Sequence, residues 1–97
     1  MKLRFTTGAH AQFHSALHHI ARDKPLAAER MRSRTLTALD RLIMYLESGR
    51  VLKEFPDSPY REVIVSPYRF VYRMEKNVVA VVGVWHSAQL PEEPGQE

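Results

Sequence analysis

The last third of the chain, residues 60–86, consists of three short apolar runs separated by two polar breaks (YREVIVSPYRFVYRMEKNVVAVVGVWH). Valine, isoleucine, phenylalanine and tyrosine dominate these runs, and all four favour β-strands. The breaks, Ser66-Pro67 and Lys76-Asn77, are short enough for tight turns. The segment therefore predicts an antiparallel meander of three strands.

Arginines interrupt the first two runs, at Arg61, Arg69 and Arg73. A charged side chain in a half-buried strand costs free energy unless it has a partner, so we expect these arginines to bind another molecule. Strand alternation predicts one face packed on helices and one face turned away. The first would carry Tyr68, Phe70, Tyr72 and Met74, and the second Arg69, Val71 and Arg73.

The same arginines also have a structural interpretation, which stays open. They would keep an exposed sheet face soluble, or pair across strands with Glu62 and Glu75. This alternative is stronger for Arg73 than for Arg61 or Arg69.

The first half of the chain predicts a strand and two helices. Residues 2–6 alternate as in a strand, and Thr6 or Thr7 would cap a helix that runs to about residue 22. Asp23 would cap a second helix with Pro25 in its first turn, ending near Ser48-Gly49. Residues 50–59 carry two prolines and predict an ordered loop. We expect an α+β fold with an N-terminal strand and a helical hairpin on an antiparallel sheet of three to four strands.

Length and composition indicate one domain, residues 1–89, followed by a disordered acidic tail, residues 90–97. The 97 residues include no cysteine, which excludes disulfides and thiolate metal sites and favours a cytoplasmic location. No run is long enough to cross a membrane. The formal charge of the chain is +3, but three of its 11 acidic residues lie among the last six residues. The residues before them hold 14 lysines and arginines and only eight acidic residues. A basic body favours polyanions or an acidic partner.

The chain resembles the RelE/ParE superfamily of toxins from type II toxin–antitoxin systems, over residues 2–88. REVIV, SPYRFVYR and VVGVWH carry most of the resemblance, with FTTGA, IARDKPLAAERM and LESGR in support. It implies a compact α+β toxin that arrests bacterial growth and is neutralised by a cognate antitoxin. It also implies that operator DNA is contacted only indirectly, through the antitoxin, and that no membrane is involved.

Members of the superfamily differ in mechanism. ParE-like toxins inhibit DNA gyrase, whereas RelE-like toxins cut messenger RNA on the ribosome. PYRFVYR and VWH look more like the ParE-like sequences, so we prefer gyrase inhibition and keep the ribosome-dependent endonuclease as the alternative. Many ParE-like chains continue from the closing histidine as Gly-Arg-Arg, whereas Ser87-Ala88-Gln89 stands here. A degenerate toxin that retains only antitoxin binding is therefore a third hypothesis.

The two active mechanisms would use overlapping residues. RNA cleavage needs cations for the phosphate, an acid and a base. Arg61 and Arg69 would clamp the phosphate together, His86 would act as the acid, and Glu54 or Lys53 would serve near the base. In a ParE-like toxin, target or antitoxin binding would involve Arg61, Arg69, Arg73, Lys53, Trp85 and His86. Trp85 and Tyr72 are otherwise aromatics of the core or its edge.

A histidine row, His10, His14 and His18, lies on the first predicted helix beside its apolar stripe, with His19 adjacent. Two imidazoles four residues apart suit zinc, but no carboxylate on this helix completes the set. We expect no metal and no cofactor, and a pH-sensitive contact with a partner is the alternative use of the row.

Overall fold

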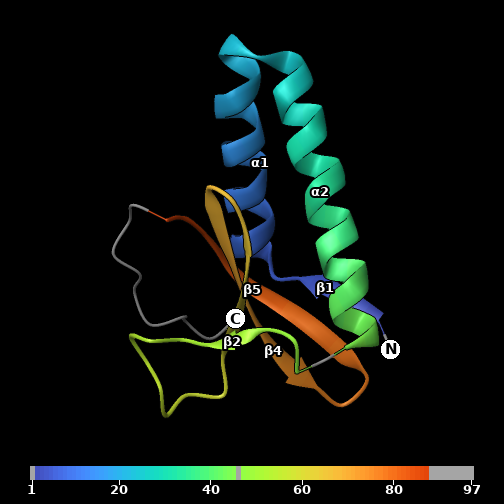
Figure 1. Cartoon of the computed structure of the whole chain (residues 1–97), viewed down its shortest axis with the longest axis vertical. Helices are drawn as coiled ribbons and strands as arrows, with labels where there is room; N and C mark the ends of the chain where they lie inside the picture. Colours follow the sequence, from blue (N-terminus) through green and yellow to red (C-terminus); the bar gives the residue numbers. More distant parts are fainter. Residues whose placement is uncertain (1, 46, 88–97) are drawn as a thin grey trace.

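A helical hairpin lies against one five-stranded sheet in the computed structural model, which describes residues 2–45 and 47–87 (Figure 1). In chain order the elements are β1 (Lys2–Phe5), α1 (Thr7–Asp23), α2 (Pro25–Met44), β2 (Arg50–Val51), β3 (Arg61–Val65), β4 (Tyr68–Glu75) and β5 (Val78–His86). The strand order is β1-β5-β4-β3-β2, with β1 parallel to β5 and every other pair antiparallel.

The predicted α+β class is confirmed, with small corrections to the sheet. It has five strands instead of three to four, because two residues of the expected loop, β2, pair with β3. It is also mixed, because β1 joins β5 in parallel. The predicted tail, residues 90–97, and the predicted domain end at residue 89 lie outside the described residues.

Both helices begin near the expected positions. The Thr6 side chain accepts a hydrogen bond from the backbone N–H of Ala9 at 3.2 Å, which caps α1 as predicted. The expected Asp23 cap of α2 is wrong: Asp23 is the last residue of α1, and Lys24 precedes Pro25 without a side-chain cap. The helix also ends at Met44, before the predicted stop at Ser48-Gly49.

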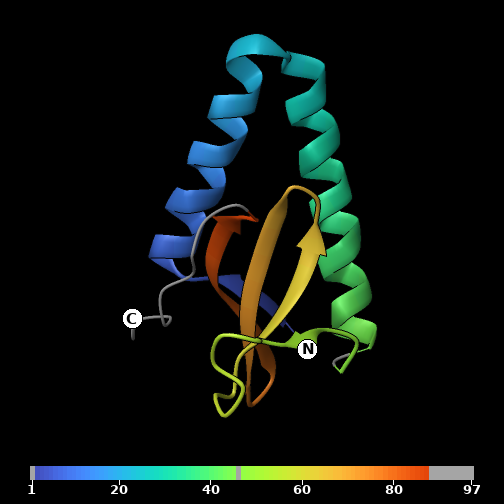
Figure 2. The same cartoon turned by 60° about the vertical axis from the view of Figure 1, so that its left-hand side comes forward.

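The hydrophobic core lies between the hairpin and one face of the sheet, and the helix tips extend beyond the strands (Figure 2). Tyr68, Phe70 and Tyr72 belong to this core, as the alternation predicted. Phe13 of α1 stacks on Phe5 and meets Phe70 edge-on, with ring centroids 5.7 and 5.5 Å apart. Met74 was expected in the same row but is 44% exposed, because it lies next to the β4–β5 turn.

The turn between α2 and β2 is held from two sides at Gly49. A Cβ on Gly49 would overlap the Tyr72 hydroxyl and lie 2.6 and 2.7 Å from two ring carbons. The Arg61 guanidinium donates a hydrogen bond to the Gly49 carbonyl at 2.9 Å. Burial raises the pKa of the Tyr72 hydroxyl, against the opposing influence of the Arg61 charge and of the Gly49 backbone. Only glycine fits at this close approach.

We therefore expect Gly49→Ala to lower the free energy of unfolding by about 2 kcal/mol, the typical cost of overpacking. Urea unfolding followed by circular dichroism measures this. Gly8→Ala is the matched control, because a Cβ there meets nothing within 4 Å and alanine favours the helix. Equal unfolding midpoints for the two variants would contradict the close packing of Tyr72 against Gly49.

Candidate functional site

The face of the sheet turned away from the helices, here called the outer face, carries three of the side chains that the sequence singled out. Register places Arg69 and Arg73 of β4 on it, together with Trp85 of β5. Leu52 and Val71 are fully buried although neither belongs to the core beneath the helices. A second, smaller buried layer therefore lies between the outer face and the segment that follows β2.

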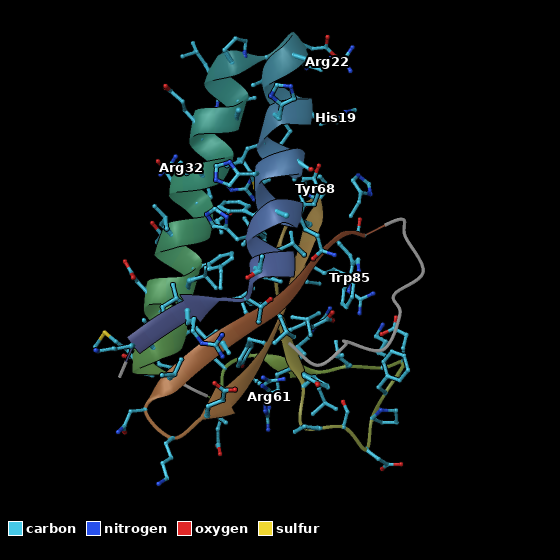
Figure 3. The ribbon with its side chains drawn as sticks, turned by 180° about the vertical axis from the view of Figure 1, so that it is seen from behind. His19, Arg22, Arg32, Arg61, Tyr68 and Trp85 are labelled. Carbon is cyan, nitrogen blue, oxygen red and sulfur yellow. The ribbon has the colours of Figure 1, made fainter. Side chains whose placement is uncertain are left out.

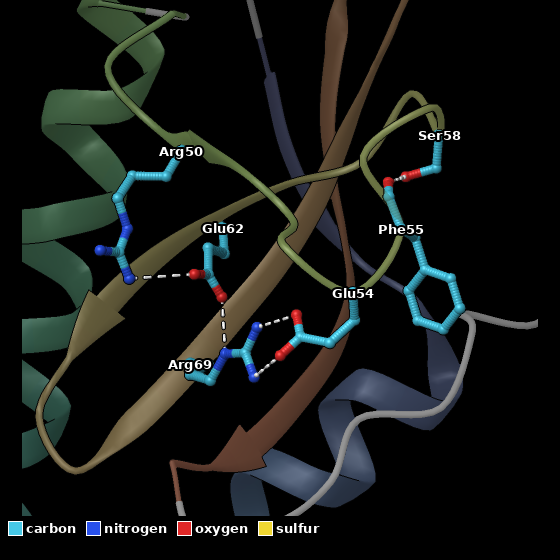
Figure 4. Close-up of polar contacts among 6 residues, drawn as sticks. All are labelled: Arg50, Glu54, Phe55, Ser58, Glu62 and Arg69. Carbon is cyan, nitrogen blue, oxygen red and sulfur yellow. Dashed lines mark hydrogen bonds and ion pairs between the residues drawn. The ribbon is translucent and has the colours of Figure 1, made fainter.

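Arg69 is the centre of an ion-pair network on the outer face (Figure 4). Its Nε donates to Glu62 Oε1 at 2.6 Å, and its two terminal nitrogens donate to both oxygens of Glu54 at 2.9 and 3.2 Å. The second oxygen of Glu62 accepts from Arg50 at 3.1 Å. Arg69 is only 8% exposed and Glu62 only 2%, so this arginine is occupied by the chain's own carboxylates.

The network changes the protonation behaviour of its members. Hydrogen bonds from Arg69 lower the pKa of Glu54, although partial burial opposes the shift. The Glu54 and Glu62 carboxylates in turn raise the pKa of Arg69, against the effect of burial. Glu54 therefore stays ionised at neutral pH and ties the segment after β2 to the sheet.

A second network neutralises Arg73. Its guanidinium contacts Glu75 Oε2 at 2.9 and 3.0 Å, and Arg4 contacts Glu75 Oε1 at 2.9 Å. Register places Ala80 between Arg4 and Arg73, and Ala80 is fully buried. Hydrogen bonds from both arginines lower the pKa of Glu75. Arg73 pairs with Glu75, as its structural interpretation expected, but the two residues belong to the same strand, β4, so the pair does not cross strands.

Arg61 does not lie with Arg69. The cross-strand neighbour of Arg61 is Tyr72, a core residue, so Arg61 lies on the face of the sheet that the helices cover. The cross-strand neighbour of Arg69 is Ile64, and both lie on the outer face. Figure 3 shows Arg61 far from Trp85, which is the cross-strand neighbour of Arg69. The structure therefore does not assemble the expected two-arginine phosphate clamp.

The remaining expected residues lie near the end of β5 and in the loop. Trp85 is half-buried on the outer face, and its ring lies over Gly83, where a Cβ would be 3.1 Å from the ring. His86 is half-buried on the other face, edge-on to Tyr68 with ring centroids 5.4 Å apart. Lys53 is exposed. These three side chains keep accessible surface for a partner.

The histidine row lies on the exposed surface of α1. The rings of His10 and His14 have centroids 4.5 Å apart, and His14, His18 and His19 line a shallow hollow with Arg22. Within residues 2–45 and 47–87, no group of three or more histidine or acidic side chains is placed to hold a metal ion. In the same ranges, no helix is both long enough and apolar enough to span a membrane.

Glu62 was expected from the sequence as a possible partner of the strand arginines, but its burial was not. Its second partner, Arg50, was not singled out at all. Basic side chains of the hairpin, in contrast, have no ion pair within the part of the chain that the structure describes: Arg22, Arg30, Arg32 and Arg41. Their helical positions were visible in the sequence, and so was a possible pairing of the sheet arginines with Glu62 and Glu75, but the pairing of Arg69 with Glu54 was not.

The family model described as the ParE toxin of the type II toxin–antitoxin system parDE matches residues 3–91, and the chain belongs to this family. Membership implies a cognate antitoxin partner. The chain is also 38% identical over 73 residues to Toxin RelE2 of Caulobacter vibrioides, covering 74% of this chain and 78% of that one.

The fold matches a solved structure of the chromosomal ParDE toxin–antitoxin system from P. aeruginosa. The TM-score is 0.73, and the match covers 89% of this chain and 95% of the other. Because the sequences are only 15% identical, this likeness shows the fold alone.

We expect Arg69→Gln to lower the free energy of unfolding by about 3 kcal/mol, because it leaves the Glu62 carboxylate buried beside a weakened set of partners. Arg73→Gln is the matched control: its partner Glu75 keeps Arg4 and solvent, so the cost should stay below about 1 kcal/mol. Chemical denaturation of both variants at neutral pH measures the difference. Equal losses of unfolding free energy in the two variants would contradict a special role for the buried contact between Arg69 and Glu62.

We expect Glu54→Gln to destabilise the protein at neutral pH and to cost progressively less as pH falls. The folded-state pKa of Glu54 lies below its ordinary value of 4.5, so the ionised carboxylate stabilises the fold above that pH and stops doing so as it is protonated. Unfolding of variant and parent between pH 7 and pH 3 measures this. Asp57→Asn, exposed and without an ion pair in the described ranges, is the control. A stability difference between Glu54→Gln and the parent that grows as the pH falls would contradict the lowered pKa of Glu54.

Proposed function

We propose that this protein arrests bacterial growth by binding DNA gyrase in the cytoplasm, and that it is neutralised by its cognate antitoxin. The observation that carries the proposal is the separation of Arg61 and Arg69 onto opposite faces of the sheet. A phosphate clamp needs both guanidinium groups on one side. An inhibitor that acts by binding has no such requirement.

The state of Glu54 also supports binding over RNA cleavage. A general base works best when its pKa lies near the operating pH. Two hydrogen bonds from Arg69 instead lower the pKa of Glu54 and occupy both of its oxygens. Glu54 is therefore a poor proton acceptor, and its position suits a structural role.

The end of β5 is the proposed contact surface. Trp85 presents a large aromatic side chain there, and Lys53 adds an exposed positive charge in the segment after β2. Tryptophan often contributes much of the binding energy at protein interfaces. His86 would border this surface from the opposite side of the strand.

A ribosome-dependent mRNA endonuclease is the second candidate, favoured by the name of the 38% identical relative, Toxin RelE2. In that mechanism His86 would be the acid, and Arg69 would have to leave Glu54 and Glu62 to reach a phosphate. Breaking a buried pair costs about 3 kcal/mol or more, which weighs against this candidate.

We expect the purified protein to inhibit supercoiling by gyrase, and Trp85→Ala to weaken inhibition about tenfold or more, as loss of an aromatic anchor does. Tyr45→Ala is the matched control, because Tyr45 is an aromatic 63% exposed at the end of α2. The half-inhibitory concentrations of the three proteins measure the effect.

Mapping of messenger RNA ends after induction separates the mechanisms. Breaks within translated codons that disappear in His86→Ala would overturn the gyrase proposal in favour of cleavage. Normal growth and unimpaired supercoiling with the folded parent protein would overturn it in favour of a toxin that retains antitoxin binding only.

A further inference from the structure

We propose that His10 and His14 of α1 form a binding site for a divalent transition-metal ion of the copper or nickel type, with water in the remaining coordination positions. The two histidines are not part of the proposed contact surface at the end of β5. The site does not depend on whether the toxin acts on gyrase or on the ribosome.

The two imidazole rings already have the separation that a shared ion requires. Their centroids are 4.5 Å apart, and their planes are inclined by 59°. A metal bound at ~2.0 Å to one nitrogen of each ring would lie ~3.2 Å from each ring centroid. Centroids 4.5 Å apart then subtend an angle of ~90° at the metal, which is the angle between neighbouring positions of a tetragonal complex.

This geometry selects the kind of metal. A tetrahedral zinc ion would hold the two centroids ~5.2 Å apart, and structural zinc sites use four protein ligands. No group of three or more candidate ligands is placed to hold a metal within residues 2–45 and 47–87. Copper(II) and nickel(II) suit tetragonal sites of nitrogen and oxygen, and copper binds more tightly than nickel. A pair of imidazoles completed by water therefore favours copper.

No metal was expected from the sequence, because no carboxylate on α1 completes the set that zinc needs. The ring contact between His10 and His14 is the observation that the sequence did not contain. His18 and His19 make no ring contact in the described part of the chain. The structure thus separates one pair from the rest of the histidine row.

The helical turn that carries the pair is held in place by the fold. The Thr6 side chain caps it through the Ala9 N–H at 3.2 Å, and the Thr6 carbonyl accepts from the His10 N–H at 2.9 Å. Ala9 is fully buried, and Phe13, next to His14, packs against the hydrophobic core. Binding an ion therefore orders only two side chains, and this preorganisation favours affinity.

Both histidines are available to a ligand. They are exposed, and neither side chain makes a hydrogen bond or an ion pair within the described ranges. Their nitrogens therefore lose only water when they bind a metal. They line one hollow between α1 and α2 together with Arg32, on the side of the hairpin that Figure 3 shows.

The surroundings of the pair limit how tightly it binds. Arg32 is the other charged group of the hollow, no aspartate or glutamate lines it, and apolar side chains form the rest of the lining. A nearby guanidinium opposes a divalent cation, although solvent screens the repulsion at an exposed site. We therefore expect a dissociation constant of about 10 μM for Cu²⁺.

The test titrates Cu²⁺ into the full chain, without an affinity tag, and follows binding by isothermal calorimetry. We expect one ion per chain. His10→Gln and His14→Gln should each weaken binding about tenfold or more, because the second imidazole no longer acts at high effective concentration. The double variant His18→Gln/His19→Gln is the matched control. It removes two histidines of the same helix but leaves the pair, so its affinity should stay within about twofold of the parent.

Two further readouts separate a chelated ion from loose binding to single histidines. Electron paramagnetic resonance of bound Cu²⁺ should show two coordinated nitrogens in the parent and one in His14→Gln. Free Cu²⁺ at 100 μM, about ten times the expected dissociation constant, should raise the unfolding temperature of the parent by about 5 °C. The same concentration should leave His10→Gln/His14→Gln unchanged.

Three outcomes would overturn the proposal. Micromolar binding that survives in His10→Gln/His14→Gln would place the ion elsewhere. Equal losses in His14→Gln and in His18→Gln/His19→Gln would show that the row binds ions without a defined pair. Half an ion per chain, with dimers in size-exclusion chromatography, would assign the ion to a bridge between two copies. None of these readouts involves growth arrest, gyrase or RNA, so this failure is distinct from failure of the proposed function.

Discussion

The buried contact between Glu62 and Arg69 is the interaction on which the outer face depends. Arg69 Nε and Glu62 Oε1 are 2.6 Å apart, and both residues are almost entirely removed from solvent. Either charge alone would be costly at this depth, and each is tolerable because the other is present. Through Arg50 and Glu54 the pair also ties β2 and the start of the segment between β2 and β3 to the sheet. Sheet and loop therefore form one unit.

This arrangement changes where the molecule presents its positive charge. The arginines of the outer face are balanced by Glu54, Glu62 and Glu75. The arginines of the helical hairpin have no such partners within the described ranges. This chain thus uses Arg69 and Arg73 for cohesion and presents its helix arginines to the surroundings.

Much of this fold was readable in the sequence, because apolar periodicity fixes which faces are buried. Thr6 as a cap and the inward row of Tyr68, Phe70 and Tyr72 followed directly from it. The faces of Arg61 and Arg69 were also readable in principle. A two-residue turn at Ser66-Pro67 pairs Val65 with Tyr68, so odd positions of β3 share a face with even positions of β4. Two odd-numbered arginines on these strands must then lie on opposite faces. Partners that come from a loop, such as Glu54, carry no periodic signal, and only the three-dimensional structure reveals them.

The central claim is that Arg69 serves the fold and does not grip a target. The most direct measurement compares growth arrest by the parent with growth arrest by the double variant Glu62→Leu/Arg69→Met, which replaces both buried charges with apolar groups. We expect the double variant to fold cooperatively and to arrest growth at induction levels within about threefold of the parent, since a replaced ion pair is often neutral for stability. A well-folded double variant that no longer arrests growth would contradict the claim, because the lost guanidinium would then be needed by the target.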